Sequence, residues 1–180
     1  MFFFPAATAL LIITFSRGTT VTPPVDDFCT KLKSMLESAH NGFNSIKGAP
    51  IERMITGSRK NFFVSKTKFV EAKDCYVSDV SAYPECECIL SADSRITPKL
   101  TAEYQRYKKL IEECLPKGWV LAEQDSSNNE YLKDTPFKKL TAREEVSGKK
   151  VKFHLYMYSS MIEKSRVVEL KIEGIGTGTK

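Results

Sequence analysis

The spacing of apolar residues changes along the chain, and this change constrains the fold more than any other feature of the sequence. In two segments apolar side chains recur every three or four positions, which is typical of a helix with one buried face. The segments after each of them alternate apolar and polar residues, as strands with one buried face do. The pattern predicts an α+β domain with the element order α-β-β-β-α-β-β-β-β.

The two helical segments have recognisable ends. The first helix is predicted to begin at Thr22, a good N-cap residue, and its apolar stripe runs as far as Phe43. The second is the clearest element, because Thr97 caps it, Pro98 opens it and Pro116 stops it. Half-polar strands joined by hairpins bury one face only. We therefore expect two main helices packed on one face of a mostly antiparallel sheet.

Seven segments are predicted to be strands. Residues 49–60 are ambiguous, because Ile51, Met54 and Ile55 could also form a short helical turn. The predicted strands are residues 62–70, 75–80, 86–91, 119–123, 137–146, 151–158 and 167–172.

The N-terminal stretch Met1–Phe15 is apolar and uncharged, and Arg17 follows it. This is the pattern of a secretory signal peptide, and it is shorter than the roughly 20 apolar residues of a membrane span. We therefore expect a leader at residues 1–18, one α+β domain at 19–173 and a flexible tail at 174–180. The protein is predicted to be secreted, and to leave no membrane segment after leader cleavage.

The chain has five cysteines, and in an exported protein cysteines form disulfides by default. A hairpin brings Cys75 opposite Cys88, and Cys29 can meet Cys114 if the two helices lie side by side. A rival pairing joins Cys114 to the strand of Cys86 and Cys88. Because the number is odd, one thiol is left free or links two chains in a disulfide-bonded dimer.

Motifs for catalysis, metals or nucleotides are not found. The two histidines, His40 and His154, have no flanking signature of a nucleophilic site, and Cys86-x-Cys88 is too short for zinc spacing. The loop 125–130 lacks the glycine of a calcium loop. The net charge of +5 comes from interspersed acidic and basic residues, which gives no reason to expect nucleic-acid binding. We predict no catalytic residue, no metal and no cofactor.

One predicted strand carries a candidate binding surface. Lys152, His154, Tyr156 and Tyr158 alternate with apolar residues and therefore share its polar side. Tyrosine is enriched at binding surfaces because it offers rigid apolar area with a polar tip. The alternative interpretation is that these tyrosines pack under a neighbouring loop or against a helix.

Basic residues gather around the same hairpin. Across it they could form a positive patch suited to an acidic partner, or else a solvated edge that resists aggregation. These residues are Lys138, Lys139, Arg143, Lys149, Lys150 and Lys152.

These observations predict a secreted, non-enzymatic binding module whose partner is a protein or an acidic surface ligand. The runner-up is a carrier of a small apolar ligand held between helices and sheet, suggested by the abundance of Phe and Tyr. A third hypothesis is a hydrolase that uses Cys or His.

Overall fold

The structure is a computed structural model that describes residues 25–52, 61–79, 83–126, 137–144, 151–160 and 164–176. The predicted leader at residues 1–18 and the start of the predicted first helix at Thr22 lie outside these residues. So do Lys149 and Lys150 of the predicted basic patch, and most of the loop 125–130.

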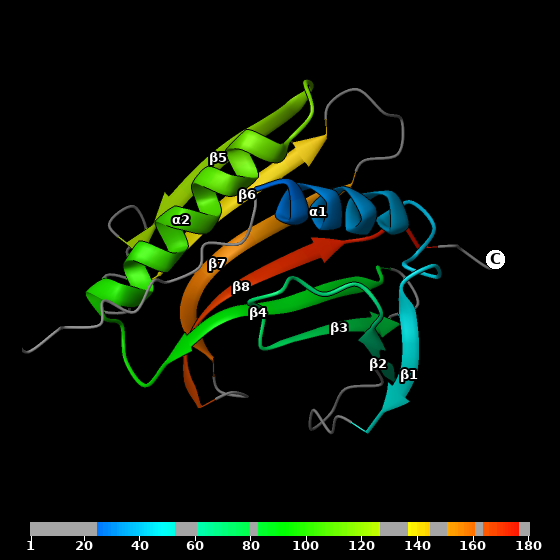
Figure 1. Cartoon of the computed structure of the whole chain (residues 1–180), viewed down its shortest axis with the longest axis horizontal. Helices are drawn as coiled ribbons and strands as arrows, with labels where there is room; N and C mark the ends of the chain where they lie inside the picture. The colour runs from blue at the N-terminus through cyan, green and yellow to red at the C-terminus, as the bar shows by residue number, and fades with distance from the viewer. Residues whose placement is uncertain are drawn as a thin grey trace, which may run out of the picture.

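Within the described residues the chain forms two helices and eight strands. The strands make one antiparallel sheet in the order β1-β2-β3-β4-β8-β7-β6-β5 (Figure 1). The α+β class is confirmed, and most of the ordered structure is sheet. The elements are α1 (Val25–Ala39), β1 (Lys47–Ile51), β2 (Asn61–Ser65), β3 (Asp74–Asp79), β4 (Glu85–Asp93), α2 (Pro98–Cys114), β5 (Trp119–Asp125), β6 (Lys138–Glu144), β7 (Lys152–Ser160) and β8 (Ser165–Glu173).

The chain consists of two halves with the same order of elements. Each half is one helix followed by four strands, and in each the successive strands are neighbours in the sheet. The last strands of the halves, β4 and β8, pair antiparallel at the centre, where Ile89 lies opposite Glu169. The helices contact each other, and both contact β4 and β8. The central strand pair and the two helices therefore join the halves into one core.

The core contains apolar side chains from both helices and from alternate positions of the strands. We call the side of the sheet that carries these strand residues the core face, and the other side the polar face. Core-face residues of the central strands include Cys86, Cys88, Leu170 and Ile172. The helices contribute buried residues that include Leu32, Met35, Tyr104, Tyr107 and Ile111.

The predicted cap of the second helix is confirmed. The hydroxyl oxygen of Thr97 accepts a hydrogen bond from the Leu100 N–H at 3.1 Å, and Pro98 occupies the first turn. The same hydroxyl donates to Asp93 at 3.0 Å. One side chain thus satisfies a helix N–H and ties α2 to the end of β4.

We expect Thr97→Ala to lower the free energy of unfolding by about 1 kcal/mol, because it leaves a helix N–H without its side-chain acceptor. Urea titration followed by circular dichroism measures the change. Thr97→Ser keeps the hydroxyl and should lose at most a few tenths of a kcal/mol. Equal losses in the two variants would contradict a capping role.

The first helix ends earlier than predicted. α1 stops at Ala39, and Gly42 and Phe43 follow with φ angles of 67° and 64°. This left-handed backbone cannot continue an α-helix. Phe43 remains fully buried, so it continues the apolar pattern without being helical.

The predicted element order lacks one strand, β1. Sequence patterns left residues 49–60 ambiguous, and Gly48 and Pro50 are both disfavoured in strands. β1 forms because it pairs with β2, with Lys47 opposite Ser65 and Ile51 opposite Phe62. A Cβ atom on Gly48 would lie 2.6 Å from the Val64 carbonyl oxygen, so only glycine fits this close approach.

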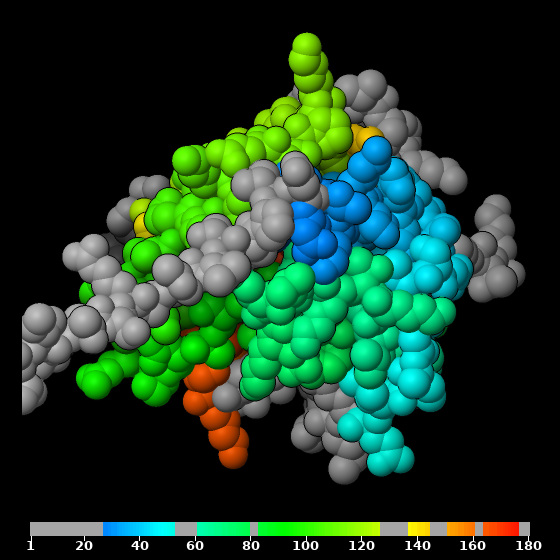
Figure 2. Space-filling model, in the orientation of Figure 1, coloured from blue at the N-terminus to red at the C-terminus, as the bar shows by residue number. Residues whose placement is uncertain are grey.

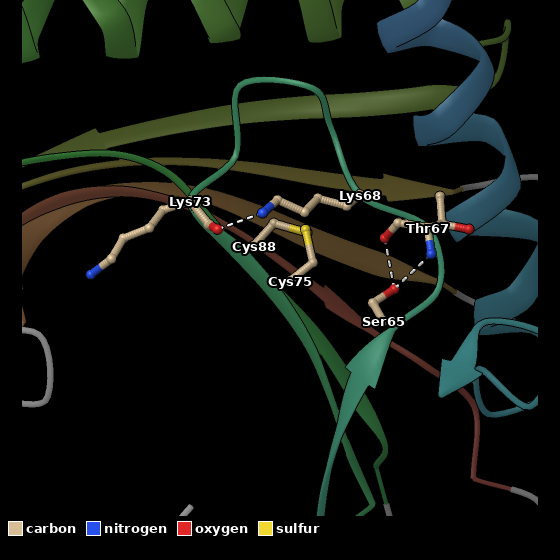
Figure 3. The surroundings of a disulfide bond; sticks show 6 residues. All are labelled: Ser65, Thr67, Lys68, Lys73, Cys75 and Cys88. Atoms are coloured by element: carbon tan, nitrogen blue, oxygen red, sulfur yellow. Dashed lines mark hydrogen bonds between the residues drawn. A yellow bond between two sulfur atoms is a disulfide. The ribbon is translucent and has the colours of Figure 1, made fainter. Parts of the chain in front are cut away.

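The predicted strand 62–70 was too long, because β2 ends at Ser65. The Ser65 hydroxyl donates to the Thr67 carbonyl at 2.7 Å and turns the chain (Figure 3). Phe69 then leaves the sheet and stacks on Phe28 of α1, with ring centroids 4.7 Å apart. In the space-filling view the segment 61–79 lies directly beside α1 (Figure 2).

The chain after β8 is held in place at its first residues. The Gly174 N–H donates to the Pro84 carbonyl at 2.7 Å, and the Ile175 N–H donates to the Ala39 carbonyl at 2.9 Å. The first two residues of the predicted tail, Gly174 and Ile175, are therefore hydrogen-bonded to the domain. Residues 177–180 lie outside the described part.

Both predicted disulfides are present. Cys29–Cys114 joins α1 to α2, and Cys75–Cys88 joins paired residues of β3 and β4 (Figure 3). The rival pairing of Cys114 does not form. Two disulfides fit an extracellular protein. No helix in the described residues is long and apolar enough to cross a membrane.

Cys86 is the free cysteine, and it is fully buried on the core face. Burial, followed by the negative charge of Glu87, raises the pKa of its thiol to about 12. A disulfide to a second chain through Cys86 would therefore require the domain to open.

Candidate functional site

The four predicted site residues share one side of β7, as the alternation predicted. Lys152, His154, Tyr156 and Tyr158 all lie on the polar face, between β6 and β8. Their cross-strand neighbours on that face are Arg143, Thr141 and Lys139 of β6, and Glu173, Lys171, Glu169 and Val167 of β8.

His154 is the centre of a hydrogen-bonded row across three strands. Its Nδ1 lies 3.0 Å from the Thr141 hydroxyl, and its Nε2 lies 3.1 Å from a Glu173 carboxylate oxygen. A neutral imidazole with its proton on Nε2 satisfies both contacts: Nε2–H donates to Glu173, and Nδ1 accepts from Thr141. The residue is only 4% exposed.

The row of hydroxyl, imidazole and carboxylate has the composition of a nucleophile–base–acid triad. Its electrostatics do not favour that use. Burial, followed by the positive charge of Lys139, lowers the pKa of His154 to about 4. A general base works best with a pKa near the operating pH, and an almost fully buried ring gives a substrate little access. We interpret His154 as a residue that positions Thr141 and Glu173.

An aromatic cluster lies beside this row. The Tyr156 ring centroid is 5.3 Å from that of His154, 6.0 Å from that of Tyr158 and 6.3 Å from that of Phe137. The Lys139 ammonium lies 5.3 Å from the Tyr156 centroid. Both tyrosines are half-buried, so part of each ring reaches the surface.

One tyrosine of the cluster, Tyr158, has a hydrogen-bonded hydroxyl. The Tyr158 hydroxyl donates to the buried carboxylate of Glu169. Burial, followed by the charge of Glu169, raises the pKa of Tyr158. The hydrogen bond fixes the orientation of this ring without covering it.

Two other lysines of the polar face, Lys152 and Lys171, are paired with acidic side chains. The Lys152 ammonium lies 2.8 Å from Glu173, and the Lys171 ammonium lies 2.7 Å from Glu85 and 3.5 Å from Glu87. Acidic and basic side chains therefore alternate across β7, β8 and β4.

The predicted basic patch is divided by the strand geometry. Lys138 lies on the core face, with its ammonium 6.0 Å from the Tyr104 ring centroid, whereas Lys139 and Arg143 lie on the polar face. Successive residues of a strand point to opposite faces, so these three cannot form one patch. Lys152 also lies on the polar face, but it forms an ion pair with Glu173.

Sequence reasoning missed the residues that β6 and β8 contribute. Thr141, Glu169 and Glu173 make the closest polar contacts to the predicted residues. The alternation of Glu169, Lys171 and Glu173 with apolar residues was a signal that β8 has a polar side. No local sequence pattern predicts which β7 residue Thr141, Glu169 or Glu173 contacts, because this depends on the pairing of the strands.

Other candidate chemistry is dispersed. Cys86 lies on the core face and His154 on the polar face, so the two cannot form a nucleophile–base pair. The other histidine, His40, lies 3.8 Å from Glu144 after the end of α1. Among the described residues no three His, Cys, Asp or Glu side chains are grouped as metal ligands.

A hollow between α1, the 67–71 loop and α2 has a volume of about 10 Å³. It is lined mainly by aromatic and acidic side chains, and this volume accommodates about one water molecule. The lining residues are Asp27, Phe28, Phe69, Val70, Glu71 and Tyr107.

Comparisons of the chain with protein-family models, with curated proteins and with solved structures find no match. Its function has to be inferred from the geometry of its own residues.

Proposed function

We propose that this protein is a secreted, non-enzymatic binding module that holds a protein partner on the polar face of its sheet. In this proposal the domain has two layers: α1 and α2 lie against the core face, and no helix of the described residues lies on the polar face. Contacts of α1 with β8 and of α2 with β7 support this arrangement (Figure 1). The apolar N-terminal stretch and the two disulfides support secretion.

One observation carries the binding role: the rings of the half-buried Tyr156 and Tyr158 lie together on a strand that is paired on both sides, beside Lys139. Aromatic side chains held in place by their neighbours lose little entropy on binding, and they are common energetic centres of interfaces. The hydrogen bond from Tyr158 to Glu169 supplies that preorganisation.

The charges near the tyrosines suggest the chemistry of the partner. Burial, followed by the positive charge of Lys152, lowers the pKa of Lys139, so the two cations disfavour each other. The charge of Lys152 is already shared with Glu173, so a partner carboxylate placed beside Lys139 would stabilise the remaining cation. We therefore propose a protein partner whose contact surface carries Asp or Glu.

The carrier alternative has weaker support. A ligand held between helices and sheet requires an apolar cavity, and the largest side chains at this interface, such as Tyr104, Phe43 and Phe153, are fully buried against their neighbours. The hollow at Phe28 and Phe69 holds only about 10 Å³.

Affinity capture with the secreted, oxidised protein tests the binding role. We expect the double substitution Tyr156→Ser/Tyr158→Ser to reduce capture of the specific partner at least about tenfold, since each lost aromatic anchor costs 1 kcal/mol or more. Quantitative mass spectrometry of the captured proteins measures the loss.

Tyr83→Ser is the matched control, because Tyr83 is 68% exposed and precedes β4, outside the cluster. It should leave capture unchanged. If the double variant stays folded and captures the same proteins in the same amounts as the unaltered chain, the tyrosine cluster is not the binding site.

A further inference from the structure

The two edges of the sheet differ in how well they are protected against pairing with another strand. β1 has five residues, contains Pro50 and has a register irregularity between Lys47 and Pro50. Short length, proline and bulges are the usual means of blocking an edge. β5 has seven residues, contains no proline and pairs with β6 in continuous register from Trp119 to Asp125. Among the described residues, β5 is therefore the edge strand that lacks these protective features.

The backbone groups that β5 presents outward follow from the hydrogen-bond pattern. The Ser126 N–H donates to the Phe137 carbonyl at 3.1 Å, which extends the β5–β6 register by one pair. In an antiparallel pair the hydrogen-bonded positions alternate, so Val120, Ala122 and Gln124 bond to β6. The N–H and C=O groups of Trp119, Leu121 and Glu123 therefore point away from the sheet, and no strand lies beside them in the described part of the chain.

The side chains of this edge do not oppose association. Leu121 is 37% exposed, and Val120 and Ala122 continue an apolar run on both faces. The one acidic side chain near the middle, Glu123, is engaged by α2: Lys108 pairs with its carboxylate, and the Tyr104 hydroxyl lies 3.5 Å from it. Glu123 therefore does not act as an uncompensated edge charge.

The β5 edge is complementary to itself in one register. Two antiparallel copies can pair only if outward-pointing residues face each other, which twofold axes from Val120 to Gln124 allow. An axis at Val120 or at Gln124 pairs only three residues of β5 from each copy, so the axes to compare are Leu121, Ala122 and Glu123. An axis at Glu123 places two carboxylates opposite each other, and an axis at Ala122 places Leu121 opposite the partner's Glu123. An axis at Leu121 pairs Leu121 with the partner's Leu121, and Val120 with the partner's Ala122. It also places Trp119 opposite the partner's Glu123, whose carboxylate is already paired with Lys108 of its own chain. Among the registers that pair five or more residues of β5, this one alone has apolar residues at its three central positions, and it separates the like charges.

We propose that the protein forms a homodimer in which β5 pairs antiparallel with the β5 strand of a second copy about a twofold axis at Leu121. The eight-stranded sheets of the two copies would become continuous across this pair. The interface would be isologous, with the same strand from each copy. The β5 edge is a different surface from the tyrosine cluster. The dimer and the binding role of the tyrosines can therefore be tested, and can fail, independently.

Sedimentation and light scattering of the full, oxidised protein over a range of concentrations test the dimer. We expect a mass that rises from monomer to dimer with concentration. Leu121→Pro removes an outward N–H and no β5–β6 hydrogen bond, and Leu121→Lys places two positive charges at the axis. Both variants should be monomeric at concentrations where the unaltered protein is a dimer, while circular dichroism shows an unchanged fold.

Val64→Lys is the matched control, because Val64 is 43% exposed on β2, an interior strand of the sheet. It should leave the mass unchanged. A monomer at every concentration, or a dimer that persists in folded Leu121→Lys, would overturn the proposal.

A cysteine cross-link tests the register. At an axis through Leu121 the two copies of residue 121 lie about 5.5 Å apart at Cα, a separation that a disulfide spans. Leu121→Cys should therefore oxidise to a covalent dimer on a non-reducing gel. Gln124→Cys, three residues from the axis, should not. Cross-linking of Gln124→Cys in preference to Leu121→Cys would exclude this register.

The tyrosine variant separates this proposal from the proposed function. Tyr156→Ser/Tyr158→Ser should dimerise as the unaltered protein does, and Leu121→Lys should keep the tyrosine cluster intact. If the tyrosine variant alone became monomeric, the dimer interface would lie on the polar face and not at β5.

Discussion

Replacing Cys29 and Cys114 together by serine should lower the free energy of unfolding by about 4.5 kcal/mol, the largest stability effect that we expect from removing one feature. This disulfide closes a loop of 85 residues, which spans the first half of the domain and α2. Removing it gives the unfolded chain much more conformational freedom, and the chain-entropy relation converts that loop length into this energy. Denaturant unfolding under oxidising conditions measures the difference.

The second disulfide provides the comparison. Cys75 and Cys88 are separated by only 13 residues, so their replacement by serine should cost less, about 3 kcal/mol. Cys86→Ser is a control that leaves both disulfides in place and reports the cost of altering a buried cysteine. If the two disulfide variants lost equal stability, loop length would not determine the effect. Hydrophobic contacts around the helices would then account for most of the free energy of unfolding that is lost.

Both disulfide pairings could be predicted from the arrangement of the elements that carry the cysteines. Cys29 and Cys114 lie on helices that were expected to pack side by side, and a hairpin with alternating residues brought Cys75 opposite Cys88. Cys86 takes part in neither disulfide. This agrees with the same alternation, since Cys86 and Cys88 share one face of β4 and cannot bond to each other.

The missed strand and the overlong strand have non-local causes. β1 is a poor strand by composition, with Gly48 and Pro50, and exists because β2 supplies a partner. The apolar alternation of residues 62–70 continued past Ser65, but Phe69 is buried against Phe28 of α1 rather than in the sheet. Neither contact can be predicted from the spacing of residues within one segment.

The candidate site was predictable to the level of a single strand. Alternation correctly placed Lys152, His154, Tyr156 and Tyr158 on one side of β7. Their environment depends on the pairing of β7 with β6 and β8, which brings residues such as Thr141 and Glu173 into contact. The exposed edge at β5 likewise follows only from the strand order, because the sequence does not say which strand is outermost.

The pH dependence of stability should reveal how His154 is held. Its pKa falls from 6.5 in an accessible state to about 4 in the folded protein, chiefly because the ring is buried and then because Lys139 is near. Between these values the unfolded chain binds a proton that the folded chain does not. The contribution of His154 to the free energy of unfolding is therefore fully present above about pH 6.5. It falls by about 3 kcal/mol as the pH decreases towards 4.

His154→Gln isolates this contribution, because an amide can still donate to Glu173 and accept from Thr141 but does not titrate in this range. Between pH 7 and pH 4 the unaltered protein should lose about 3 kcal/mol more stability than the variant, since the carboxylates contribute similarly to both. Nuclear magnetic resonance titration of the imidazole gives the folded pKa directly. Parallel stability curves, or an imidazole that titrates near pH 6.5, would mean that the ring is solvated. It would then be free to act as a base, and the positioning role inferred from the row of Thr141, His154 and Glu173 would be wrong.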